Sequence, residues 1–117
     1  QAEQHGAPLR FHIDSSDMAF RNTTIAQLAT LGGVPETSPG VDLLLVDLDP
    51  WGPGSPPRVH SLAADWQPGA LVGISGATDS IPRQLLPPLV LLDKLTVAAQ
   101  PALLLQTPAE QLRRRSG

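Results

Sequence analysis

The segment VDLLLVD, residues 41–47, decides the fold. Apart from Asp42 it is continuously apolar until it ends at Asp47, and it is too short for a typical helix. A short run of Leu and Val is typical of a strand buried on both faces, and such strands belong to parallel sheets. We therefore expect residues 41–46 to form a buried strand whose carboxyl end carries Asp47.

Three further short apolar segments repeat this pattern along the chain. Residues 9–13 alternate apolar and polar side chains, whereas residues 70–74 and 89–92 are nearly continuous in apolar character. Stretches with helical composition separate these segments, as parallel strands require, because the chain must cross over between them. The pattern predicts an α/β fold, an open parallel sheet of about four strands with helices on both faces.

Helix signals lie between the predicted strands. The first predicted helix spans residues 18–32, with an apolar stripe and a stop at Gly32-Gly33, and a short helix is expected over residues 79–86. Residues 96–115 are helical in composition but are interrupted by two prolines. The stripe of the first helix is Met18, Ile25, Leu28 and Ala29. A helix opened by Pro56-Pro57 has its apolar positions at Val59, Leu62, Ala63 and Trp66.

The composition limits the classes of protein to which the chain can belong. Its 117 residues suit one domain, and a net charge of −3 with only two Trp, two Phe and no Tyr argues against a nucleic-acid partner. The absence of cysteine excludes disulfides and thiolate metal sites. No apolar run approaches the roughly 20 residues of a membrane span, so we expect no membrane insertion of this segment.

The domain organisation follows from where the periodic segments begin and end. We expect a linker at residues 1–8, one domain at residues 9–106, and a C-terminal helix or linker at residues 107–117. The chain starts at Gln1 rather than Met, and we interpret it as one domain of a longer soluble, cytoplasmic protein.

Polar side chains follow each of the predicted strands. Because the carboxyl ends of parallel strands meet at one edge of a sheet, these side chains should converge on a single crevice. Carboxylates can hold a divalent ion through oxygen ligands, and a lysine with a hydroxyl can neutralise phosphoryl oxygens. Phosphate chemistry is therefore the best match for this set. Its members are Asp14, Asp47 with Asp49, Ser75 and Lys94.

The segments that carry these residues resemble, in their order, the receiver domains of two-component response regulators. The resemblance covers most of residues 9–106 and implies a flavodoxin-like topology. It implies a soluble bacterial signalling module, most simply a part of a hybrid sensor histidine kinase. The implied partners are a histidine kinase, a histidine phosphotransfer domain, or neighbouring domains of the same protein. The matching pieces are residues 9–14, 41–47, 71–76 and 89–96.

The resemblance also implies a role for each residue at the strand ends. Asp47 matches the phosphate-accepting aspartate, and Lys94 matches the lysine that contacts the phosphate. Ser75 matches the switch hydroxyl. Asp14 matches an acidic metal-site position, so that Asp14, Asp47 and Asp49 would hold Mg²⁺ in an active domain. No enzymatic activity is expected beyond phosphoacceptance at Asp47, although a parent protein could be a histidine kinase.

Several features depart from the receiver pattern. Serines follow Asp14 where the family has a second acid, and Leu95 follows Lys94 where the family has a proline. Residues 33–40 are too few for the second strand and helix, because a βαβ unit needs about 30 residues. Without a second strand, the edge of residues 9–13 would be exposed and would permit a homodimer. These departures favour a degenerate module that binds protein.

Alternative interpretations stay open for individual residues. Asp14 either caps the helix that begins at Met18 or belongs to the pocket, while Ser75 and Asp49 also suit plain turns. Lys94 also suits a solvated strand end. His5, His12 and His60 lack metal-ligand spacing and are expected at the surface, Trp66 is expected in the core, and Trp51 is a candidate for a partner surface.

Three functions are therefore considered from the sequence. The sequence favours a degenerate receiver that acts through protein interactions. The first alternative is an active receiver that takes phosphate from a phosphohistidine onto Asp47 with Mg²⁺. The second alternative is a small-ligand or nucleotide-sensing domain, although the chain has neither a Gly-x-Gly-x-x-Gly fingerprint nor a P-loop.

Overall fold

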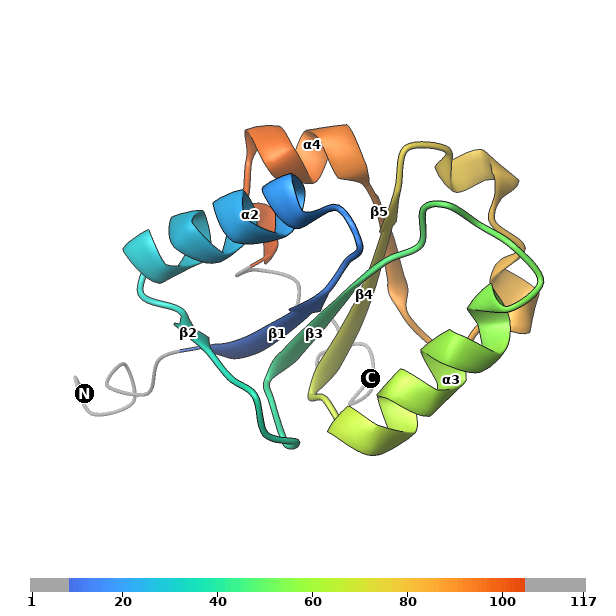
Figure 1. Cartoon of the computed structure of the whole chain (residues 1–117), viewed down its shortest axis with the longest axis horizontal. Coiled ribbons are helices and arrows are strands. Elements are labelled where there is room, and N and C mark those ends of the chain that lie inside the picture. The colour runs from blue at the N-terminus through green and yellow to red at the C-terminus, as the bar shows by residue number, and fades with distance from the viewer. Residues whose placement is uncertain (1–8, 105–117) are drawn as a thin grey trace, which may run out of the picture.

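The computed structural model describes residues 9–104, which form one parallel sheet with helices on both faces (Figure 1). The predicted linker at residues 1–8 and the predicted helix or linker at residues 107–117 lie outside the described residues. The α/β class and the parallel sheet expected from the sequence are confirmed. No helix among the described residues has the length and apolar character needed to cross a membrane.

The sheet has five strands in the order β2-β1-β3-β4-β5, and every neighbouring pair is parallel. All carboxyl ends therefore lie at the same edge, the upper one in Figure 1. The strands β3 and β4 are buried along their whole length, as their continuous apolar sequences require. The strand bounds are β1 Arg10–Asp14, β2 Val34–Pro35, β3 Leu43–Asp47, β4 Ala70–Ser75 and β5 Val90–Asp93.

The expected number of strands was too low by one. Residues 34–35 form β2, which pairs with β1 at Arg10 and Phe11, so this part of the edge of β1 is covered rather than exposed. The amide of Val34 donates to the carbonyl of Leu9 (2.7 Å), and the amide of Glu36 donates to that of Phe11 (2.8 Å). No helix follows β2: residues 36–42 lead directly into β3. The second βα unit thus keeps a short strand and lacks its helix.

The helices divide between the two faces of the sheet, as Figure 1 shows. Helices α2 (Met18–Thr30) and α4 (Lys94–Ala99) pack on one face through Leu28 and Val97. Helix α3 (Ser55–Trp66) covers the other face through the fully buried Val59, and the apolar stripe predicted for it is confirmed.

Three local expectations were wrong. Ala29, expected on the apolar stripe of the first helix, is exposed. Met18 is 55% exposed, because it is the first residue of α2 and precedes the part of the helix that reaches the sheet. The helix expected over residues 79–86 is instead two short 3₁₀ segments, Thr78–Ser80 and Arg83–Leu85, separated by Pro82. Proline at that position lacks an amide hydrogen and so interrupts helical hydrogen bonding.

A ring stack replaces part of the cover that a second helix would provide. Trp66, at the end of α3, stacks on His12 of β1 with ring centroids 3.9 Å apart and an interplanar angle of 14°. His12 also contacts the carbonyl of Glu36 at 3.1 Å. Both rings are half-buried, so His12 is not a surface residue and Trp66 is at the margin of the core rather than inside it.

Candidate functional site

The side chain of Asp47 lies at the carboxyl end of β3 and is only 1% exposed. Its carboxylate has three donors within the chain. Oδ2 accepts from the hydroxyl of Ser15 (2.7 Å) and from the ammonium of Lys94 (2.9 Å), while Oδ1 accepts from the amide of Asp49 (3.0 Å). A buried charge is costly unless it is paired and hydrogen-bonded, and Asp47 meets both conditions.

Lys94, which contacts Asp47, lies 47 residues further along the sequence. It is the first residue of α4, directly after β5, and its ammonium also donates to Asp17 at 3.3 Å. The ammonium lies 5.0 Å from the centre of the Phe20 ring, within the range of a cation–π contact. Lys94 is thus an organised part of the site, and the alternative of a solvated strand end does not hold.

The charges of Asp17 and Lys94 stabilise each other. The amide of Phe20, and then the ammonium of Lys94, hold the pKa of Asp17 below its ordinary value of 3.8. Burial alone would lower the pKa of Lys94, but hydrogen bonds to Asp47 and Asp17 outweigh it and raise the pKa above the ordinary 10.5. The contribution of Lys94 to stability is therefore complete below the ordinary lysine pKa and is lost as pH rises through the raised value.

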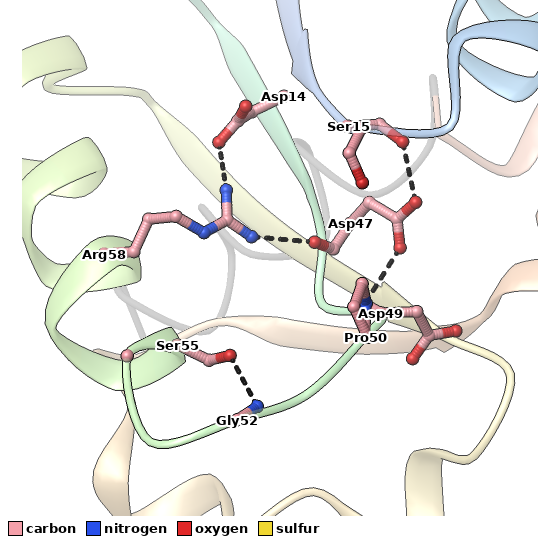
Figure 2. A pocket seen from close by; sticks show the side chains of 10 residues that line it. Asp14, Ser15, Asp47, Asp49, Pro50, Gly52, Ser55 and Arg58 are labelled. Carbon is pink, nitrogen blue, oxygen red and sulfur yellow. Dashed lines mark hydrogen bonds and ion pairs between the residues drawn. The ribbon is translucent and has the colours of Figure 1, made fainter.

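Asp14 has a partner that the sequence analysis did not identify. The guanidinium of Arg58, from the first turn of α3, donates to the carboxylate of Asp14 through Nη1 and to the main-chain carbonyl of Asp47 through Nη2 (2.9 Å). Figure 2 shows Arg58 between these two groups. The N-cap of α2 is Asp17, which accepts from the amide of Phe20 at 3.1 Å, so Asp14 is not the cap.

Asp49 and Ser75 form a separate contact on the other side of Asp47. The hydroxyl of Ser75 donates to Asp49 Oδ1 (2.7 Å), and the amide of Gly76 donates to Oδ2 (2.8 Å). The Ser75 oxygen in turn accepts from the amide of Ala77 (2.9 Å). These bonds tie the loop after β3 to the loop after β4, and they direct the Ser75 hydroxyl to Asp49 rather than to Asp47.

A cleft of about 500 Å³ opens over this edge of the sheet, between the β1–α2 loop and the start of α3. Figure 2 shows the side chains around it. The lining residues are Asp14, Ser15, Ser16, Asp47, Asp49, Pro50, Gly52, Gly54, Ser55 and Arg58.

The residues present do not fit the Mg²⁺ site that the receiver resemblance implies. Within residues 9–104, no group of three or more His, Cys, Asp or Glu side chains is arranged to hold a metal ion. The carboxylate of Asp14 is paired with Arg58, both oxygens of Asp47 accept hydrogen bonds, and Asp49 is bound to Ser75 and Gly76. A divalent ion needs several oxygens turned toward one point, and here they are turned toward different donors.

The structure brings the five residues selected from the sequence to one edge of the sheet. Asp47 and Lys94 are in direct contact, and Ser75 contacts Asp49. Asp14 is linked to Asp47 only through Arg58.

Three participants were missed or set aside: Ser15, Asp17 and Arg58. Ser15 and Asp17 lie in the polar run directly after β1, and Arg58 lies in the helix that follows the Asp47 loop. These positions, close to the carboxyl ends of β1 and β3, were the only features of the sequence that could have identified the three residues as part of the site. Trp51 is half-buried against the core cluster on the α3 face.

Comparison with protein-family models, curated proteins and solved structures finds no match to this chain. The interpretation of the site therefore rests on its geometry.

The lowered pKa of Asp17 predicts a pH-dependent loss of stability in acid. Asp17→Asn keeps the N-cap, because Asn caps as well as Asp, but it removes the charge that faces Lys94. We expect the variant to be less stable than the wild type above the ordinary Asp pKa of 3.8. As pH falls through the lowered pKa, the wild type binds the proton and the two proteins become equally stable.

Urea unfolding at a series of pH values measures this difference, and added salt should reduce it because Asp17 is exposed. Asp65→Asn, at an exposed acid of α3, is the matched control and should change stability little over the same range. A difference between wild type and Asp17→Asn that persists unchanged at the lowest pH would contradict the pairing of Asp17 with Lys94.

Proposed function

We propose that the domain is a receiver-like regulatory module of a bacterial two-component protein, acting in the cytoplasm through contacts with other proteins rather than as an efficient phosphoacceptor. The strand order β2-β1-β3-β4-β5 is that of flavodoxin-like sheets, the topology that the receiver resemblance implies. Asp47 ends β3 and Lys94 follows β5, and their ion pair at 2.9 Å supports the assignment of both to receiver positions.

The observation that carries the degenerate form of the proposal is the burial of the Asp47 carboxylate together with the hydrogen bonds that both of its oxygens accept. A phosphoacceptor oxygen must be approached by the phosphorus of the donor to about 3–3.5 Å with a lone pair free for attack. Here the side chain is 1% exposed, and Ser15, Lys94 and the amide of Asp49 donate to its two oxygens. An acceptor in this arrangement would have to break buried hydrogen bonds before it could react.

Two exposed apolar side chains suit a protein partner at the same edge. Leu95 is 76% exposed and follows Lys94, and Met18 is 55% exposed and follows Asp17. Since Lys94 contacts Asp17, the first turns of α4 and α2 lie together beside the buried carboxylate. Removing exposed apolar side chains from water favours association with a partner. We propose a histidine phosphotransfer or kinase domain as the partner, because a phosphohistidine would be presented to this edge.

The second candidate is the active receiver, and the observation that favours it is the same 2.9 Å contact. A lysine at this distance from the nucleophile is placed to neutralise the oxygens of a phosphoryl group. The small-ligand alternative would use the cleft of about 500 Å³, but that cleft is open and lined by charged and small residues. Such a lining lacks the mainly apolar walls that small-molecule pockets usually have.

A phosphodonor experiment separates the two receiver candidates. The domain is incubated with acetyl phosphate and Mg²⁺, and its intact mass is measured. In an active receiver an Asp47 oxygen would bond to phosphorus while acetate leaves. We expect no added phosphoryl mass, because the carboxylate is buried and both of its oxygens already accept hydrogen bonds. A phosphoryl group that appears on the wild type and is absent from Asp47→Asn would establish the active receiver instead.

A binding experiment tests the regulatory role directly. Purified histidine phosphotransfer domains and kinase dimerisation domains from the source organism are titrated into the domain by calorimetry. We expect one of them to bind, and Leu95→Asp to weaken that binding about tenfold or more. Leu85→Asp is the matched control, since Leu85 is 50% exposed but lies in the 3₁₀ segment after β4.

Binding that Leu95→Asp and Leu85→Asp weaken equally would reject the proposed edge as the interface. Failure of every histidine-bearing domain to bind would reject the two-component assignment.

A further inference from the structure

We propose that Arg58 is a tethered cation that takes the place of a divalent metal ion, so that the positive charge between Asp14 and Asp47 comes from a side chain of the domain itself. The inference deepens the proposed function and rests on it in one respect only, the expectation of a metal site between Asp14 and Asp47. The observation that carries it is the bridge that Arg58 makes from the Asp14 carboxylate to the Asp47 carbonyl.

The position of Arg58 follows from the local sequence. The turn Gly52-Pro53-Gly54 ends the loop after β3, and α3 begins at Ser55 with prolines in its first turn. Arg58 is therefore in the first turn of the helix, close to the carboxyl edge of the sheet. From there its side chain reaches Asp14 at the end of β1, across the end of β3, as Figure 2 shows.

The groups that Arg58 contacts are the kind that a hard cation uses. Mg²⁺ is bound through carboxylate and carbonyl oxygens, and Arg58 contacts one of each. The planar guanidinium presents several N–H donors in fixed directions, so one side chain can satisfy two acceptors at once. Two of the oxygens that a metal ion between Asp14 and Asp47 could use are thus already bound to Arg58.

A tether gives Arg58 an advantage over an ion from solution. A group joined through a short flexible linker acts at an effective concentration on the order of millimolar or higher, and Mg²⁺ also gives up its hydration shell reluctantly. The other cation of the site, Lys94, contacts Asp47 and Asp17 from the opposite side.

The energy of the bridge is small enough for its removal to be tested. The side chains of Arg58 and Asp14 are 42% and 32% exposed, so water screens their attraction. Partly exposed ion pairs contribute little to the free energy of folding. A variant without the guanidinium should therefore fold, and the freed oxygens of Asp14 and Asp47 should become available to a metal ion.

Calorimetric titration with MgCl₂ and MnCl₂ tests the proposal on the full chain. We expect the wild type to bind neither ion measurably at low millimolar concentration. Arg58→Ala should bind at least one of them, with an affinity about tenfold or more above that of the wild type. Adding Asp14→Asn to Arg58→Ala should abolish the gain. Arg83→Ala, at an exposed arginine outside the cleft, is the matched control and should behave as the wild type.

Arg58→Gln provides a second variant that keeps most of the side-chain length, and circular dichroism establishes that each variant is folded. The proposal is overturned if the wild type binds Mg²⁺ as tightly as Arg58→Ala, or if folded Arg58→Ala and Arg58→Gln bind neither ion. Neither result alters binding of a histidine-bearing domain at Leu95, so failure of this inference is distinguishable from failure of the proposed function.

Discussion

The carboxylate of Asp47, buried at the end of a central strand, must find its hydrogen-bond donors within the chain. Leaving such a charge unpaired costs about 3–5 kcal/mol, a large part of the stability of a domain of this size. Its donors come from three places: Ser15 before α2, Lys94 at the start of α4, and the amide of Asp49 in the loop after β3. Satisfying one carboxylate therefore fixes three segments that are distant in sequence.

The contacts that stabilise this edge also limit its chemistry. A reactive carboxylate needs an open approach, whereas a structural carboxylate is buried and is held by donors within the protein. Asp47 is a structural carboxylate in this sense, because its side chain is 1% exposed. Arg58 adds to the hydrogen bonding of the same edge by donating to Asp14 and to the main-chain carbonyl of Asp47. Proteins commonly gain stability at the expense of a strained or reactive site. The burial and hydrogen bonds of Asp47 are therefore the features on which the proposed regulatory use depends.

Local sequence predicted most of the sheet, because buried parallel strands have a composition that few other elements share. The apolar segment 41–47 and the three similar segments of the chain predicted β1, β3, β4 and β5 to within one or two residues. The parallel arrangement of these strands in turn predicted that Asp47 and Lys94 meet at one edge of the sheet. Strand β2 was not predictable in this way. Two residues carry no periodicity, and their pairing depends on contacts with β1. The role of Arg58 also required coordinates, since a long side chain can point in many directions from one helical position.

The measurement that tests this account most directly is a double-mutant cycle between Asp47 and Lys94, with urea unfolding as the readout. We expect Lys94→Met alone to cost about 3–5 kcal/mol, because it leaves the Asp47 charge buried without its cation. In the Asp47→Asn background the same change should cost less by about 1–3 kcal/mol, the usual coupling of residues in contact. Arg83→Met controls for loss of an exposed cation. Additive single effects, with Lys94→Met no more costly than Arg83→Met, would contradict the account.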